Sequence, residues 1–226
     1  MPAKRKAFPL VRNKAVYKKH RPARVPRNVV ARPFPARKTV KLTYCEVLTL
    51  NPVTGYDVTS YAFRCNSIFD PNITGAGHQP YAHDTYQSMY THYSVKSSTI
   101  DINFADQNTG DPGPAMVGCF ISDTYTSGST IVNYNEIREM PGGVSKMLTR
   151  HVPASVRHTY VRDTSFPVFD QGRASAIFGD NPVEAAFFNV YCSANPNLNN
   201  DDIGICAFVR ITYDVEMWEP KKLGLS

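Results

Sequence analysis

The chain has 226 residues and a mass of 25.2 kDa, which allows one large domain or two small ones. A hydrophobic content of 42% predicts a folded core, and thirteen Tyr within an aromatic content of 12% favour β structure. No apolar run approaches the roughly 20 residues that span a bilayer, so we do not expect an integral membrane protein.

The net charge of +6 conceals a strong asymmetry along the chain. The first 41 residues carry fourteen Lys/Arg and no Asp or Glu, whereas the rest carry eleven Lys/Arg against nineteen Asp/Glu, a net charge of −8. A cationic tether on an acidic body is typical of a chain that neutralises a polyanion with the tether. The predicted nucleic-acid-binding residues are Lys4, Arg5, Lys6, Arg12, Lys14, Lys18, Lys19, Arg21, Arg24, Arg27, Arg32, Arg37, Lys38 and Lys41.

Residues 1–38 are predicted to form a basic arm, and residues 39–226 the folded domain. Six prolines and a high charge leave the arm too little apolar surface to fold alone. It lacks the apolar core of a signal peptide. A mitochondrial presequence would be Ser-rich and helical, but the first serine is Ser60 and the prolines prevent a continuous helix.

Two basic clusters in the arm, separated by eleven residues, match a bipartite nuclear-import signal. Three aromatic residues lie among the cations, Phe8, Tyr17 and Phe34. They can be read equally as rings that stack on unpaired bases or as ordinary spacers. The residues predicted for the import signal are Lys4, Arg5, Lys6, Lys18, Lys19 and Arg21.

From residue 39 onward, apolar and polar residues alternate with a period of two, which predicts β-strands. Asp84 and Gln87 form a capping box that predicts one helix of about ten residues, with Tyr86, Met89, Tyr90 and Tyr93 on its apolar face. The predicted strands are 39–50, 58–66, 95–104, 115–122, 144–151, 155–162, 185–193 and 203–216.

Eight strands joined by loops too long for tight hairpins argue against an up-and-down barrel. They favour a two-sheet Greek-key arrangement, of which the eight-stranded jelly roll is the common case. The predicted fold class is therefore all-β: a jelly-roll β-sandwich with one short helix and a disordered basic N-terminal arm. Loop aromatics such as Tyr125, Tyr134 and Trp218 are candidates either for subunit contacts or for local packing.

No catalytic or metal-binding pattern stands out, and we predict no enzyme, no metal site and no cofactor. A metal-binding jelly-roll enzyme would need an HxH pattern, which is absent, and there is neither a GxSxG elbow nor a P-loop. His151 and His158 lie on predicted neighbouring strands. One interpretation is a ligand pair that meets across a hairpin, and the simpler one is two structural histidines. Asp106, Asp111, Asp201 and Asp202 are read as solvated loop acids.

The five cysteines, Cys45, Cys65, Cys119, Cys192 and Cys206, are odd in number and have no CxxC pair. They are expected to be buried, reduced side chains rather than a disulfide framework. Asn72-Ile73-Thr74 matches a glycosylation sequon, which means little in a chain without a secretory route.

Several short motifs in fixed order resemble the capsid proteins of circular, Rep-encoding single-stranded DNA viruses, the circovirus-like groups. The basic arm and the final strand extend the resemblance over most of the chain. The motifs are Phe63-Arg64-x-Asn66-Ser67, Asp70-Pro71, Gly75-x-Gly77-His78-Gln79-Pro80, Asp84, Tyr90…Tyr93-x-Val95…Ser98-x-Ile100 and Glu216-Met217-Trp218-Glu219.

This resemblance implies a jelly roll with sheets BIDG and CHEF that assembles into an icosahedral shell of sixty copies around single-stranded DNA. It also implies location in the virion and, during assembly, in the host nucleus. The partners would be single-stranded DNA, further copies of the chain, nuclear-import receptors and an unknown host attachment receptor.

Two other classes of function remain open on the residues alone. A ribosomal or chromatin-type protein would also anchor a small β-domain with a basic extension, although such domains are usually basic themselves. An enzyme on a jelly roll is the third, and activity abolished by chelation would distinguish it.

Overall fold

The computed structural model describes residues 34–51, 58–107, 114–125, 134–140, 142–149, 152–166, 170, 172–193 and 204–222. Residues 33–226 belong to one compact unit. Within the described ranges, no helix is long and apolar enough to cross a membrane.

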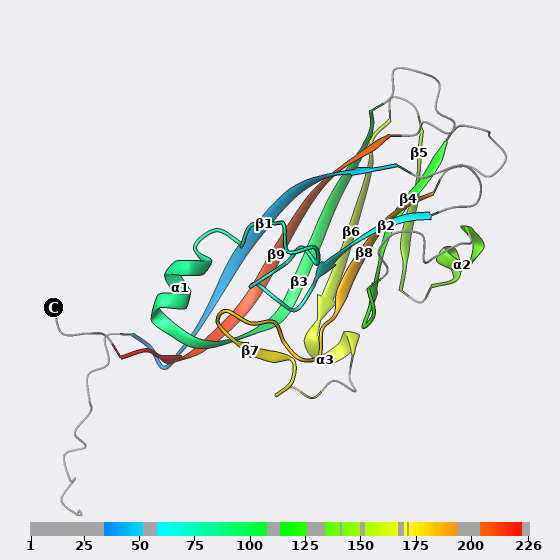
Figure 1. Cartoon of the computed structure of the whole chain (residues 1–226). Helices are drawn as coiled ribbons and strands as arrows, with labels where there is room; N and C mark the ends of the chain where they lie inside the picture. Colours follow the sequence, from blue (N-terminus) through cyan, green and yellow to red (C-terminus); the bar gives the residue numbers. More distant parts are fainter. Residues whose placement is uncertain are drawn as a thin grey trace, which may run out of the picture. The chain divides into compact units, whose positions relative to one another are not determined.

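Within these ranges, nine antiparallel strands form two sheets (Figure 1). Sheet A has the order β1-β9-β3-β6, with β7 paired to the start of β3, and sheet B has the order β2-β8-β4-β5. The strands are β1 (Arg37–Leu50), β2 (Val58–Arg64), β3 (Tyr90–Asp106), β4 (Ala115–Ser122), β5 (Val144–Leu148), β6 (Ala154–Val161), β7 (Ser175–Ile177), β8 (Phe187–Ser193) and β9 (Ile205–Pro220).

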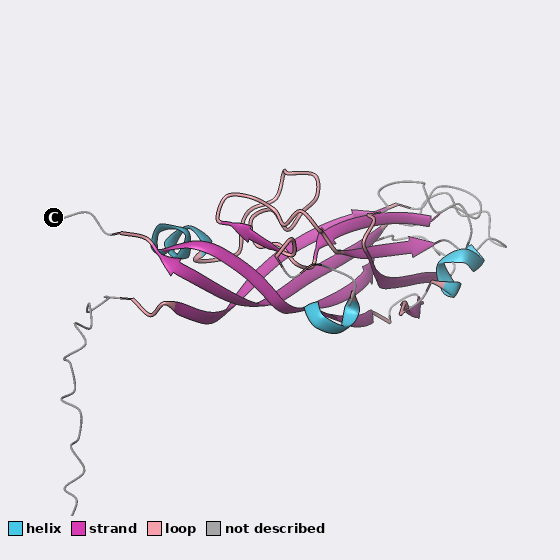
Figure 2. Ribbon diagram, turned by 90° about the horizontal axis from the view of Figure 1, so that it is seen from below, coloured by secondary structure: helices cyan, strands magenta, loops and turns pink. Residues whose placement is uncertain are grey.

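The strand order is that of a jelly roll. If the short β7 is set aside, the remaining eight strands can be lettered B to I in chain order. The strand order is then B-I-D-G in sheet A and C-H-E-F in sheet B. Figure 2 shows the strands stacked in two layers. The predicted fold class and sheet composition are therefore confirmed by the pairing itself.

The core lies between the two sheets and is built from alternate residues of each strand. On β9, for example, the residues from Val209 to Met217 alternate between buried and accessible positions. Large aromatic side chains fill much of the core, and six tyrosines are almost completely buried. This alternation is the physical basis of the period-two pattern seen in the sequence.

In the described part of the chain, three short helices join the strands: α1 (His83–Met89), α2 (Tyr134–Glu139) and α3 (Arg162–Ser165). The predicted helix was too long, because Tyr90 and Tyr93 belong to β3, where both are fully buried. The capping prediction was also wrong. The N-cap is Ala82, in a left-handed conformation, so that Asp84 lies in the first turn and contacts His83 instead.

Several strand ends differ from the prediction. Strand β8 begins at Phe187 rather than at residue 185, because the Ala186 N–H is bonded to the Asn66 side chain and not to a neighbouring strand. Strand β9 continues to Pro220, four residues beyond the predicted end. The segments α2 and β7 lie where only loops were expected, and α3 begins at Arg162, the last residue of the predicted strand 155–162.

Four of the five cysteines are buried, as predicted, but Cys45 is exposed on the outer face of β1. Burial raises the pKa values of the Cys119 and Cys192 thiols well above the ordinary value of a cysteine, so both thiols stay protonated at neutral pH.

Candidate nucleic-acid interface

Most of the predicted nucleic-acid-binding residues, from Lys4 to Arg32, lie outside the described ranges, as do Phe8 and Tyr17. The three that are described all lie on β1. Arg37 and Lys38 open the strand, and Lys41 follows on the same edge. Phe34 is half-buried against the core, so its ring belongs to the folded body rather than to unpaired bases.

The start of β1 is held by a stack of side chains. The Arg37 guanidinium lies 5.9 Å from the centre of the Trp218 ring, and Trp218 in turn stacks on His92 at 5.6 Å with an interplanar angle of 10°. Arg37 also pairs with Glu216 at 3.3 Å. Lys38 lies on the other side of the strand, 5.2 Å from the Tyr86 ring. These contacts fix the point at which the basic arm joins the body.

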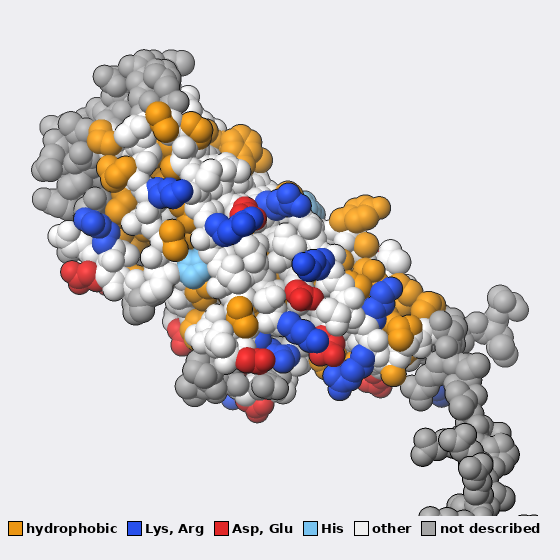
Figure 3. Space-filling view, turned by 180° about the vertical axis from the view of Figure 1, so that it is seen from behind, with side chains coloured by type: hydrophobic (Ala, Val, Ile, Leu, Met, Phe, Trp, Pro, Cys, Tyr) orange, Lys and Arg blue, Asp and Glu red, His pale blue; other side chains and the backbone are white. Residues whose placement is uncertain are grey.

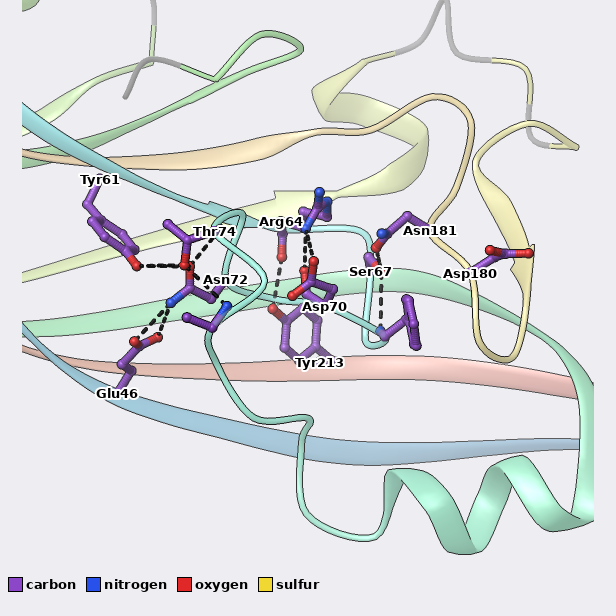
Figure 4. Close-up of polar contacts among 12 residues, drawn as sticks. Glu46, Tyr61, Arg64, Ser67, Asp70, Asn72, Thr74, Asp180, Asn181 and Tyr213 are labelled. Atoms are coloured by element: carbon purple, nitrogen blue, oxygen red, sulfur yellow. Dashed lines mark hydrogen bonds and ion pairs between the residues drawn. The ribbon is translucent and has the colours of Figure 1, made fainter. Parts of the chain in front are cut away.

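The residues between β2 and α1 that carry the sequence motifs form a polar network, and its hydrogen bonds hold this connection against the sandwich (Figure 4). Arg64 binds the carboxylate of Asp70 at 2.9 Å and its carbonyl oxygen at 2.7 Å. The fully buried Tyr213 hydroxyl donates to the Arg64 carbonyl at 2.8 Å. The Ser67 hydroxyl donates to Asn181 at 2.7 Å. These hydrogen bonds hold the loop after β2 against the sandwich.

Asn66 and Asn72 satisfy further buried groups of the same segment. Asn66 donates to the Glu184 carbonyl at 2.7 Å and accepts from the Ala186 N–H at 3.0 Å. Asn72 donates to the Glu46 carboxylate at 2.9 Å and accepts from the Tyr61 hydroxyl. Because Asn72 is only 1% exposed and bonded through both side-chain atoms, its sequon is closed to glycosylation in the folded chain.

Burial dominates the ionisation of the phenols in this region. It raises the pKa of Tyr93 to about 12, even though Ser67 opposes the shift through a hydrogen bond. It also raises the pKa of Tyr44 far above the ordinary range, and the neighbouring Glu46 carboxylate adds to the effect. Both side chains therefore act as neutral hydrogen-bond donors near neutral pH.

Among the described residues, no group of three His, Cys, Asp or Glu could hold a metal ion. His83 is buried on α1, whereas His92 lies on β3 beside Trp218. His158 bonds to the Gly142 carbonyl, and His151, its proposed partner, lies outside the described ranges together with Asp111, Asp201 and Asp202.

The three loop aromatics that were candidates for subunit contacts, Tyr125, Tyr134 and Trp218, differ in their surroundings. Tyr125 is 53% exposed and packs edge-on against Phe187 at 5.4 Å. Trp218 is half-buried in the stack described above, which favours local packing for that ring. The Tyr134 side chain lies outside the described part of the chain.

The sequence analysis missed three cations on the outer face and edge of the sandwich. Lys146, Arg157 and Arg210 come from β5, β6 and β9 and line one open depression of about 550 Å³. Arg157 pairs with Asp101, which raises the pKa of its guanidinium. Arg157 and Arg210 stand at exposed positions of strands whose burial alternates, and that signal could have identified them once strand pairing was known; Lys146 lies in a run of exposed residues on β5 and gives no such signal.

The chain was also compared with known proteins. No family model and no curated protein sequence matches it. Several solved structures are similar in strand arrangement. Against the decameric BFDV capsid protein, the identity is 10% over 81% of this chain and 99% of that chain, with a TM-score of 0.48. Against turnip yellow mosaic virus, the identity is 12% over 86% of this chain and 87% of that chain, with a TM-score of 0.43. Against mud crab tombus-like virus, the identity is 8% over 99% of this chain and 93% of that chain, with a TM-score of 0.49.

The class of protein that the strand order defines is the jelly-roll β-sandwich. That assignment rests on the pairing of this chain's own strands.

Proposed function

We propose that this protein is a viral capsid subunit that assembles into a closed icosahedral shell and packages circular single-stranded DNA through its basic N-terminal arm. The observation that carries the proposal is the segregation of charge, with fourteen cations and no acid in the first 41 residues of a chain whose remainder has a net charge of −8. A body of that charge repels a polyanion overall, so the arm is the part suited to neutralise phosphates.

The jelly roll supports this proposal because it provides a rigid body with two broad sheet faces and several loop ends for contacts between copies. Sixty chains would contribute about 840 cations, enough to neutralise a similar number of phosphates. Binding through the backbone charge would be nearly independent of base sequence and would weaken as the salt concentration rises.

The two basic clusters at residues 4–6 and 18–21 are proposed to act as a nuclear-import signal before assembly. The partners would then be host import receptors, single-stranded DNA and further copies of the chain, with an attachment receptor still to be identified. The protein would be found in the nucleus during assembly and in the virion afterwards.

Light scattering of the purified full chain, together with the 260/280 nm absorbance ratio of the same peak, tests assembly and packaging at once. The expected species has a mass of about 1.5 MDa, sixty copies with closed symmetry, and carries nucleic acid. A monomer or dimer under all salt conditions would contradict the capsid proposal and favour a ribosomal or chromatin-type binding protein.

The role of the arm needs a variant that leaves β1 intact. Deletion of residues 1–33 preserves Arg37 and Lys38, which lie opposite Trp218 and Met217, respectively, in the register of β1 with β9. A second variant replaces the eleven Lys/Arg between residues 4 and 32 by Gln and keeps the length of the arm. Both are expected to fold but to lose nucleic acid, and retention equal to that of the full chain would refute the proposed role.

A further inference from the structure

The outer face of sheet A is organised in rows that run across the strands, because residues opposite each other in the register point to the same side. One row consists of Cys45, Arg210, Asp101 and Arg157. The next row consists of Val47, Phe208, Asn103 and Ser155. A cationic row therefore lies directly beside a row that holds an aromatic ring.

The charges of this face are unequal in their pairing. Asp101 is bound to Arg157, and Glu216 is bound to both Arg37 and Lys96, so these two acids are neutralised by their neighbours. By contrast, Arg210 and Lys146 are exposed and have no ion pair within the described ranges. Figure 3 shows Lys and Arg side chains spread along one face of the molecule, with acidic side chains between them.

Two features in and beside the depression suit a nucleotide. Asn103 lines the depression and accepts a hydrogen bond from the Ser155 hydroxyl at 2.6 Å, and Phe208 lies opposite Asn103 in the register of β9 with β3. Phe208 is 48% exposed and Val47, opposite it, is 59% exposed. An exposed ring beside unpaired cations is the combination that single-stranded nucleic-acid sites use, with the ring for a base and the cations for the backbone.

We propose that this face is a second nucleic-acid contact, in which Lys146, Arg157 and Arg210 hold phosphates and Phe208 stacks on an unpaired base of single-stranded DNA. The proposal rests on the proposed packaging function and adds a site on the folded body to the arm. Strand β1, which follows the arm in the chain, belongs to the same sheet as this site, and Arg37 and Lys41 lie on its outer face opposite Trp218 and Asp214.

A row of four threonines separates the Arg210 row from the row that holds Lys41 and Asp214. Thr43, Thr212, Thr99 and Thr159 lie opposite one another on β1, β9, β3 and β6. The row is uncharged and flat, so it offers hydroxyl groups and no repulsion to a backbone that passes over it. The Lys41 and Arg210 rows are four residues apart, or about 13 Å along the strands.

The test uses the full chain and a thymidine-rich oligonucleotide that carries 5-iodouracil, which cross-links to aromatic residues under ultraviolet light. Cross-linked peptides are identified by mass spectrometry. We expect one cross-link at Phe208 in addition to those in the arm. In Phe208→Ala that cross-link disappears, and the affinity for the oligonucleotide falls by about tenfold, the typical loss of one stacked base.

The matched pair of variants is Lys146→Gln/Arg210→Gln against Lys221→Gln/Lys222→Gln, which remove the same charge from exposed positions. The first double variant should weaken the Phe208 cross-link at least fivefold and reduce the salt dependence, the slope of log K against log salt, by about 1.4. The second should leave the cross-link unchanged.

The outcomes separate this proposal from the packaging function on which it rests. Cross-links confined to the arm would overturn the contact on sheet A and leave packaging by the arm intact. Equal effects of the two double variants would overturn the specific site as well. A full chain that neither cross-links to nor retains DNA would overturn both proposals.

Discussion

Replacing Asn66 by Ala tests whether the polar network after β2 holds the sandwich together. The Asn66 side chain is fully buried and satisfies two backbone groups from the segment before β8, the Glu184 carbonyl and the Ala186 N–H. Each buried backbone group left without a partner costs about 1–3 kcal/mol, so the free energy of unfolding should fall by about 2–5 kcal/mol. For a chain of this size the melting temperature would fall by about 5–15 °C.

Urea unfolding of the dispersed subunit gives the measurement, with light scattering to confirm that no shells are present. Trp218 is the only tryptophan and is half-buried on β9, so its fluorescence reports on sheet A directly. Asn103→Ala is the matched control, because this asparagine is exposed and should change stability by less than about 0.5 kcal/mol. If Asn66→Ala unfolded at the same urea concentration as the control, the network would not have the structural role assigned to it.

Three further results are expected. Gly118→Ala should abolish soluble folded protein, because a Cβ there would collide with the Val144 carbonyl oxygen; recovery of wild-type yield would contradict the packing of β4 against β5. A thiol reagent should modify only Cys45 in the native protein and all five cysteines in urea, and a second fast thiol would show that the core opens. Burial raises the pKa of Tyr93 from 10 to about 12 in the folded chain. As the pH rises, the unfolded chain therefore loses the Tyr93 proton before the folded chain does. The free energy of unfolding should fall between pH 10 and pH 12, by about 2–3 kcal/mol for this one phenol. Absorbance at 295 nm with parallel unfolding curves checks this, and a Tyr93 that titrates near pH 10 in the folded state would refute it.

The sequence predicted the fold well where side chains alternate between core and solvent. Strand β4 was predicted at its observed bounds, and the eight main strands were all found, because burial on one face imposes a period of two over each of them. Short elements such as β7 could not be predicted. Its three residues form a strand only because they lie beside Tyr93 on β3, a contact between residues about eighty positions apart.

The helix was mispredicted for a related reason. Tyr86, Met89, Tyr90 and Tyr93 have helical spacing, but the last two are needed in β3, where they are fully buried. Local periodicity cannot decide between two structures that bury the same residues, so the tertiary pairing of β3 with β9 sets the end of the helix.

The candidate interface was predictable only in part. The cations of the arm are visible as a run in the sequence, and their role stays a prediction. Lys146, Arg157 and Arg210 are scattered over 65 positions and come together only through the strand order. The net negative charge of the body gives no indication that these three cations lie close together.

The position of β9 has a consequence for the synthesis of the protein. This strand is the last one described along the chain, yet it lies between β1 and β3 and pairs with both over almost its entire length. While a ribosome is still making residues 205–220, β1 has no neighbour in sheet A and the strand that carries the arm cannot be anchored. A nascent chain therefore cannot complete sheet A until β9 has been translated, because the pairing of β1 depends on the last of the described strands.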